Sequence, residues 1–186
     1  MQEVIKNRRS VRNFLEKEVD KDLVLEIIDS ARYAPFGGPP IKECQAWNFI
    51  IIKDKEVKER LSHSFKSRDA ENFLNAPVVI AVVMAKTDQR YKDWDVVAGL
   101  AIENILLTIE EKGLGGFFMT SYTHNEEHIH DREELIKNLG IPNEDFELIA
   151  FIPLGYPDPE EIIPDKELKE LKDMIHFDVW NSQNNI

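Results

Sequence analysis

The segment "PVVIAVVM", residues 77–84, constrains the fold of this chain more strongly than any other feature. Its residues are apolar at successive positions, so a strand built from them is hydrophobic on both faces. Such a strand is stable at the centre of a sheet that other elements cover on both sides. A second apolar segment, "FELIAFIPLGYP" at residues 146–157, predicts another buried strand that stops at Gly155-Tyr156-Pro157.

The longest predicted helix covers residues 95–112 and is apolar nearly all round, interrupted only by Glu103 and Asn104. A helix of this kind is buried, either in a core or at a subunit interface. Gly113 follows it as the residue that ends the helix. Another helix is expected after Asp20, a plausible N-cap, because Leu23, Val24, Ile27, Ile28 and Ala31 recur on one helical face.

Shorter patterns complete the expected layout. Further helices are predicted at residues 3–9, 55–65, 131–139 and 165–175, the third of them closed by Gly140. Further strands are predicted at residues 47–52 and 115–122. This order of elements predicts an α+β fold, in which helices pack against a mainly antiparallel or mixed sheet.

Length and charge exclude several classes of protein. The chain has 186 residues, a length typical of one domain, so we expect residues 1–186 to form a single domain. A net charge of −12 argues against general nucleic-acid binding, which needs a basic face. The N-terminus has no apolar signal region, and the longest apolar run, residues 76–85, is shorter than the roughly 20 residues that span a bilayer. We therefore expect a cytoplasmic protein without membrane contact.

The stretch "NRRSVRNF", residues 7–14, places Arg8, Arg9 and Arg12 within five residues of an acidic chain. Like charges this close repel, so an anion is expected to neutralise them. Guanidinium groups suit bidentate contacts with phosphate. The alternative is pairing with the chain's own carboxylates at Glu3, Glu16 or Glu18. The residues by themselves leave both interpretations open.

Two other motifs are weaker. "GLGG" at residues 113–116 follows a helix and precedes a strand, whereas a dinucleotide-binding fingerprint needs the opposite order. "HNEEH" at residues 124–128 matches the H-x-x-E-H zinc pattern, in which Glu127 would act as general base. The segment is predicted to be a polar loop, so we expect no metal. A metal site that uses His124 and His128 stays an alternative.

The ordered set "RRSVRNF", "ARYAP", "QAWNFIII", "EKGLGGFFMTSY", "IPLGYP" and "LKDMIHFDVW" resembles the nitroreductase family of FMN-dependent oxidoreductases. The resemblance covers residues 3–180. It implies a three-layer α+β fold, with helices on both sides of a mainly antiparallel mixed sheet. It also implies an obligate homodimer with two FMN sites at the subunit interface. The helix at residues 95–112 would then be the central helix of that interface.

The resemblance also implies roles for the arginine cluster. By position, Arg8, Arg9 and Ser10 match the residues that hold the FMN phosphate and ribityl chain. Arg12 matches the basic residue beside the pyrimidine edge of the isoalloxazine. A cation at that edge would stabilise the negative charge that develops at N1 and O2 when the flavin is reduced.

Later segments supply the remaining expected contacts. Thr120 and Ser121 match the strand-end residues whose backbone lies near flavin N5. Lys169 is the first candidate for a late basic residue at the phosphate, and Lys166 is the second.

A loop from the partner subunit is expected to lie over the flavin. By the same resemblance, Pro35, Phe36 and Gly37 of each subunit belong to this loop and would contact the flavin of the other subunit. Many family members read P-S-x-x-N-x-Q-P-W there, whereas Phe36 follows Pro35 in this sequence, and "FGGPPIKEC" separates Pro35 from the "QAW" at residues 45–47. Phe36 could stack on the flavin ring or on the substrate.

The function that the resemblance implies is electron transfer from NAD(P)H, through flavin N5, to a nitroaromatic, quinone or similar acceptor by a ping-pong mechanism. This scheme needs no side-chain acid or base, so no residue is predicted to be catalytic in its own right. Two alternatives share the flavin. One is a specialised enzyme of the reductive dehalogenase or flavin-fragmenting type. The other is a non-enzymatic flavin-binding module, which the altered loop at residues 35–45 suggests.

Overall fold

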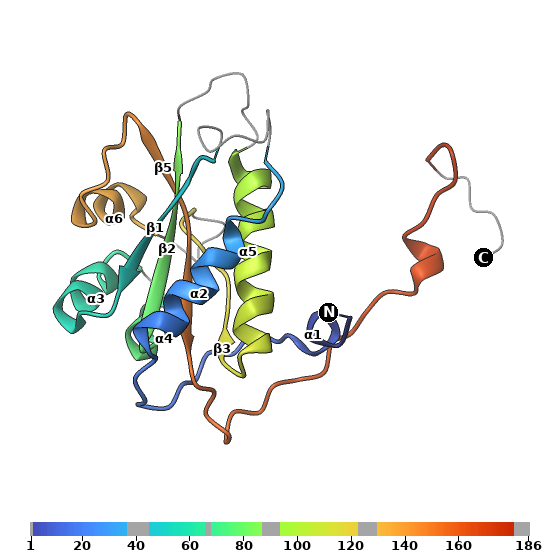
Figure 1. Ribbon diagram of the computed structural model, residues 1–186, viewed down its shortest axis with the longest axis horizontal. Coiled ribbons are helices and arrows are strands. Elements are labelled where there is room, and N and C mark those ends of the chain that lie inside the picture. The colour runs from blue at the N-terminus through green and yellow to red at the C-terminus, as the bar shows by residue number, and fades with distance from the viewer. Residues whose placement is uncertain (1, 37–44, 66–67, 87–93, 123–129, 181–186) are drawn as a thin grey trace.

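The computed structural model describes residues 2–36, 45–65, 68–86, 94–122 and 130–180. Within these residues a five-stranded sheet has the order β1-β2-β5-β3, and β4 also pairs with β5. Strands β1 (Trp47–Ile52), β2 (Val78–Ala85) and β5 (Phe146–Gly155) are long, whereas β3 (Gly115–Gly116) and β4 (Met119–Thr120) are short. Figure 1 shows helices on both sides of this sheet.

Every pairing between these strands is antiparallel. Strand β2 pairs with β1 from Trp47 opposite Met84 to Ile52 opposite Val79, and it pairs with β5 on its other edge. Strands β3 and β4 pair with successive parts of β5. A parallel contact occurs only at an isolated bridge from Ser10 to Gly116 among the described residues. The expected α+β fold with a mainly antiparallel sheet is therefore confirmed.

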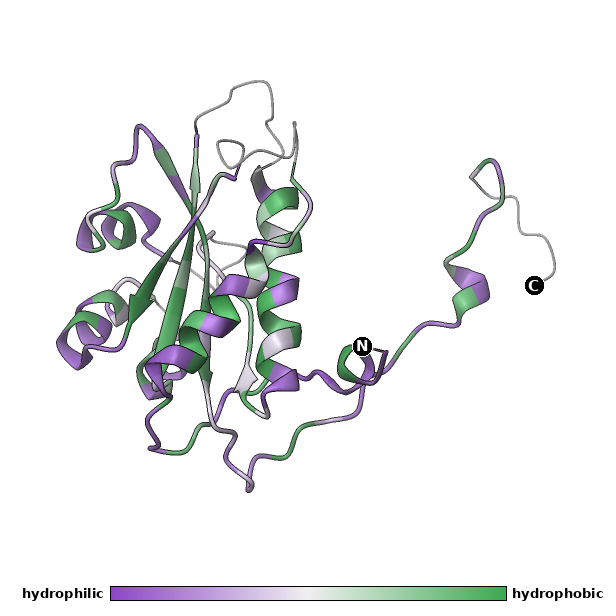
Figure 2. Ribbon diagram, in the orientation of Figure 1, coloured by the Kyte–Doolittle hydropathy of each residue, from purple (hydrophilic) through white to green (hydrophobic). Residues whose placement is uncertain are grey.

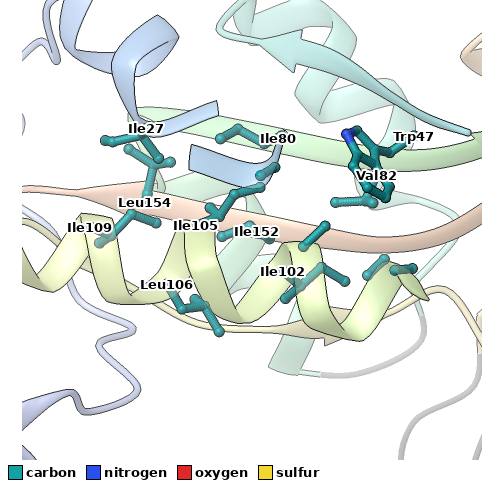
Figure 3. Close-up of a cluster of buried hydrophobic side chains, with 14 of the residues drawn as sticks. Ile27, Trp47, Ile80, Val82, Ile102, Ile105, Leu106, Ile109, Ile152 and Leu154 are labelled. Carbon is teal, nitrogen blue, oxygen red and sulfur yellow. The ribbon is translucent and has the colours of Figure 1, made fainter. Parts of the chain in front are cut away.

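Strand β2 is buried along its whole length, as its apolar sequence predicted. Its even-numbered residues, such as Ile80 and Val82, face α2 (Lys21–Ala31) and α5 (Trp94–Glu111). Figure 3 shows how side chains from α2, α5 and strands β1, β2 and β5 meet in this layer. The cluster includes Ile27, Trp47, Ile80, Val82, Ile102, Ile105, Leu106, Ile109, Ile152 and Leu154.

The odd-numbered residues of β2 face the other helical layer. This layer contains α3 (Lys55–Ser62), α4 (Arg68–Asn75) and α6 (Arg132–Asn138). Its centre is aromatic: the ring of Phe73 lies 5.2 Å from that of Phe65 and 5.4 Å from that of Phe151. The sheet is thus covered on both faces, and Figure 2 shows β2 in the hydrophobic colour between two helical layers.

The predicted start of α2 at Asp20 is confirmed by a hydrogen-bonded N-cap. The Asp20 carboxylate accepts hydrogen bonds from the amides of Asp22 at 2.8 Å and Leu23 at 3.3 Å.

Because α2 covers the sheet beside α5, loss of this cap should destabilise the whole fold. We expect Asp20→Ala to lower the free energy of unfolding by about 1 kcal/mol. Denaturant unfolding at one protein concentration would measure it. Asp20→Asn keeps a good cap acceptor, so an equal loss in that variant would argue against the capping explanation.

The predicted helix at residues 165–175 is wrong. The structure has only a short 3-10 turn there, η2 (Leu171–Asp173). Leu168 and Leu171 are exposed, so none of the described elements covers them to stabilise a helix, and short isolated helices are marginal in water. Helix α4 was not predicted from the sequence. The first helix, predicted at residues 3–9, is present as α1 (Gln2–Asn7).

The single strand predicted at residues 115–122 is also wrong, because two short strands occupy this region. The reason lies in the partner strand. The carbonyl oxygen of Pro153 in β5 accepts a hydrogen bond from the Phe117 amide at 3.3 Å, but proline has no N–H to return one. The ladder therefore breaks between β3 and β4.

After β5 the chain leaves the sheet. Figure 1 shows this tail, up to Trp180, extending past α1 and away from the rest of the fold. Its large apolar side chains are exposed: Ile162 by 93%, Leu168 by 81% and Trp180 by 80%. In the part of the chain that is described, no helix has the length and apolar character needed to cross a membrane.

Candidate functional site

The arginine-rich segment runs along the outer edge of the sheet beside β3. The Val11 amide donates to the Gly116 carbonyl at 3.3 Å, and Val11 is buried. A Cβ atom at Gly115 would lie 2.6 Å from the Val11 side chain, closer than any real contact. The glycines of "GLGG" therefore serve close packing as well as the turn at Gly113, which has φ +69°.

Arg8 and Ser10 lie at an open cavity of about 420 Å³ on the outer side of α5. Both side chains are half-buried. The other residues that line the cavity are Gly99, Ile102, Glu103, Leu106 and Phe118. Two of the residues expected to hold a phosphate and its attached chain are thus brought together beside an apolar helix.

The Arg9 side chain forms hydrogen bonds with the backbone of its own segment. Its Nη1 atom donates to the carbonyl oxygens of Lys6 at 2.7 Å and Asn7 at 3.0 Å. These carbonyls end α1, where the helix carries partial negative charge. Arg9 therefore caps α1 and adds positive charge beside Arg8.

Lys166 joins this cluster from the other end of the chain. Its Nζ atom donates to the carbonyl oxygens of Ile5 at 3.3 Å and Lys6 at 3.4 Å. Desolvation, followed by the positive charges of Arg8 and Arg9, lowers the pKa of Lys166 from its ordinary value. Lys169, the first candidate from sequence, is exposed and has no hydrogen bond or ion pair to another described residue. Lys166 therefore lies beside the arginine cluster, and Lys169 makes no such contact in the described part of the chain.

Arg12 extends toward the surface on the same segment. Its guanidinium carbon lies 5.1 Å from the centre of the Phe117 ring, and its Nη1 donates to the Ser10 carbonyl at 3.4 Å. The guanidinium forms no ion pair with another described residue. The carboxylate that meets this segment is Glu161, which accepts hydrogen bonds from the backbone amides of Arg12 and Asn13.

The proposed pairing with Glu3, Glu16 or Glu18 is not found. None of these carboxylates forms an ion pair with the three arginines, although all of these residues are described. Glu18 instead pairs with Lys53 at 2.9 Å. Glu161 carried no sequence signal, because it is 149 residues from Arg12.

The residues expected near flavin N5 lie at the end of β4: Thr120 is its last residue, and Ser121 follows directly. Ser121 is fully buried: its hydroxyl donates to the Leu148 carbonyl at 2.7 Å, and its amide donates to the Ile149 carbonyl at 3.0 Å. Thr120 is half-buried, and its Oγ1 accepts a hydrogen bond from the Tyr122 amide at 3.2 Å. Ser121 thus faces the interior, which leaves Thr120 as the partly exposed member of the pair.

A polar network that sequence reasoning missed supports this strand end. The Tyr122 hydroxyl donates to Glu147 Oε1 at 3.4 Å, and Glu147 also pairs with Arg132 and with Lys86, whose Nζ lies 3.1 Å from Oε2. Desolvation first, then the negative charges of Asp95 and Glu147, raise the pKa of Tyr122 from its ordinary value. Tyr122 is therefore a neutral phenol at working pH.

The expected cofactor loop is described only at its start. Pro35 is exposed, and the Phe36 ring packs edge-on against Trp47 with centroids 5.6 Å apart. Gly37 lies outside the described residues, and so do His124, Glu127 and His128. The described residues contain no group of three or more side chains that could bind a metal.

The layered fold of this chain is also found in proteins whose structures have been solved. The chain is 25% identical to a structure titled "FMN-dependent Nitroreductase" from Clostridium difficile R20291, with a TM-score of 0.77 over 97% of this chain and 100% of that one. The Nitroreductase family model matches residues 5–72 and 62–156. The protein belongs to the nitroreductase family.

Two curated relatives are similar over most of their length. A protein of Methanothermobacter thermautotrophicus named "Putative NADH dehydrogenase/NAD(P)H nitroreductase" is 30% identical over 181 residues, which cover 96% of this chain and 86% of the relative. An iodotyrosine deiodinase of Thermotoga neapolitana is 27% identical over 192 residues, which cover 89% of this chain and 94% of the relative.

Proposed function

We propose that the protein is an FMN-dependent NAD(P)H oxidoreductase. One observation carries this proposal: Arg8, Arg9 and Lys166 lie close together although they come from opposite ends of an acidic chain, and Arg8 lines the cavity on α5. None of the three forms an ion pair with a carboxylate in the described part of the chain. Glu103 and Glu110 act on Lys166 electrostatically without forming an ion pair with it. The three cations outnumber these carboxylates, and such a cluster suits a phosphate group, which carries about two negative charges at neutral pH.

The residues present fit FMN. Arg8 and Lys166 would hold the phosphate, Arg9 would add charge from the end of α1, and Ser10 would bind the ribityl chain. Thr120 and Ser121 would border the N5 side of the flavin. Pro35, Phe36 and Gly37 would belong to the loop from the other subunit.

Bound FMN would supply the redox chemistry. The contribution of this chain is placement and charge: Arg12 would stabilise negative charge at the pyrimidine edge of the flavin. We propose that NAD(P)H and the acceptor, a nitroaromatic, quinone or similar compound, use the same pocket in two separate half-reactions. No side-chain acid or base takes part in this scheme.

We further propose that residues 1–186 act as one domain of a cytoplasmic homodimer. The outer face of α5 presents Val96, exposed by 65%, and Leu100, exposed by 42%, and Phe118 lies nearby at the cavity. The tail exposes a further set of large apolar side chains. Groups of exposed large apolar side chains mark sites of protein–protein contact, so both surfaces are proposed to pack on a second copy.

The test is the visible spectrum of the purified protein with FMN, followed by anaerobic titration with NADH and NADPH. We expect a stoichiometric flavin spectrum that is bleached by at least one nucleotide. Arg12→Ala is expected to bind FMN and to lower its reduction potential, whereas Arg60→Ala, on α3 across the sheet, is a control that should leave the potential unchanged. A protein that stays colourless after FMN addition contradicts the proposal, and FMN binding without NAD(P)H oxidation favours the non-enzymatic module.

Reductive dehalogenation is a second candidate, favoured by the similarity to the iodotyrosine deiodinase of Thermotoga neapolitana. In that reaction two electrons and a proton convert a carbon–iodine bond into a carbon–hydrogen bond and release iodide. Incubation of the reduced protein with iodotyrosine would test it. Iodide release at a rate that exceeds nitroaromatic or quinone reduction would make this the principal activity.

A further inference from the structure

The Glu161 carboxylate binds the backbone of the arginine-rich segment at two successive residues. Oε1 lies 3.1 Å and Oε2 lies 3.3 Å from the Arg12 amide nitrogen, and Oε2 lies 3.2 Å from that of Asn13. The Asn13 carbonyl accepts a hydrogen bond from the Asp158 amide at 3.1 Å, so the same stretch is joined to the start of the tail twice. A turn places Glu161, because its amide donates to the Asp158 carbonyl at 3.1 Å.

Two successive backbone N–H groups thus donate to one carboxylate of the chain itself. Hydrogen bonds to an ionised acceptor are about twice as strong as neutral ones. The Arg12 side chain, in contrast, is exposed, and its contacts with described residues are a long hydrogen bond to the Ser10 carbonyl and the Phe117 ring. Glu161 therefore holds the backbone from which the Arg12 side chain extends toward these two contacts.

We propose that Glu161 is a positioning residue that holds Arg12 against the pyrimidine edge of the flavin. This inference rests on the proposed function, because it gives Arg12 a flavin to face. Glu161 acts through backbone geometry: its hydrogen bonds set where the Arg12 cation lies, and the cation in turn stabilises the reduced cofactor. The carboxylate of the tail thereby links the C-terminal segment to the electrostatics of the redox site.

The test compares FMN affinity and flavin reduction potential in four variants of the full-length protein: Glu161→Ala, Glu161→Gln, Arg12→Ala and the Arg12→Ala/Glu161→Ala double variant. We expect Glu161→Ala to lower the potential, as Arg12→Ala does, and to raise the FMN dissociation constant roughly three- to tenfold. Glutamine keeps one carbonyl acceptor, so Glu161→Gln should recover part of the loss. In the Arg12→Ala background, Glu161→Ala should change the potential no further, because residues that act through one another are not additive.

Glu160→Ala is the matched control, because it removes the same charge at the adjacent, exposed position. It should leave the potential unchanged. A higher potential in both Glu161→Gln and Glu161→Ala would show that the negative charge acts directly and would overturn the positioning role. Additive shifts in the double variant would also overturn it. Absence of FMN from the unmodified protein would instead contradict the proposed function, which separates the two failures.

Discussion

A protein that carries Val96→Glu and Leu100→Glu is expected to be a monomer that no longer retains FMN. Both positions lie on the outer face of α5, where their native side chains are exposed in the isolated chain. In the proposed dimer this face is buried, so each subunit would bring two unpaired carboxylates into an apolar contact. Each such charge costs several kcal/mol, more than an interface can absorb at four positions.

Sedimentation or light scattering would measure the oligomeric state. The unmodified protein should have twice the chain mass of 21.6 kDa, and the variant should have the mass of one chain. Leu74→Glu is a suitable control, because Leu74 is similarly exposed, by 39%, but lies on α4 beyond the opposite face of the sheet. A dimeric double variant with bound FMN would place the interface elsewhere.

Removal of Arg8 and Lys166, the two cations proposed to hold the phosphate, is expected to have the second-largest effect. Arg8→Ala and Lys166→Ala should together raise the FMN dissociation constant by roughly 10²- to 10⁴-fold, because each hydrogen bond to a charged group contributes about 1.5–3 kcal/mol. The effect should shrink as salt is added, since salt screens exposed charges. Fluorescence titration with FMN would measure both quantities.

Lys169→Ala provides a sharp comparison for this prediction. It removes the same charge three residues from Lys166, but Lys169 has no hydrogen bond or ion pair among the described residues. We expect it to weaken FMN binding by less than threefold, a loss typical of an exposed charge. If Lys169→Ala weakened binding more than Lys166→Ala, the sequence-based assignment would be preferred over the geometric one.

The parts of the fold that sequence predicted well are those with strong local patterns. Residues 77–84 are apolar at every position, and the strand appears within one residue of that prediction. The cap at Asp20 and the left-handed glycines at positions 113 and 140 are also local features, and the structure confirms them. In each case the chemistry of a few neighbouring residues decides the backbone conformation.

The failures have a common physical origin in distant partners. Residues 115–122 have strand-forming side chains, but Pro153 in β5 lacks the donor that a continuous ladder needs. Residues 165–175 have a helical pattern, but no other described element covers their apolar side chains. Local propensity is a weak prior, and tertiary context overrides it at both places.

The sequence by itself determined the layered α+β fold, the family resemblance and the identity of the arginine cluster as the leading site. Only the tertiary structure decided which residues meet that cluster. Lys166 and Glu161 lie about 150 residues or more from the groups that they contact. The sequence offered Lys166 only as a second choice after Lys169, and nothing in it marked Glu161. The positions of both residues depend on the path of the tail after β5, which returns beside the N-terminal segment. Backbone hydrogen bonds from the Leu15 amide to the Tyr156 carbonyl and from the Asp158 amide to the Asn13 carbonyl hold these two segments together.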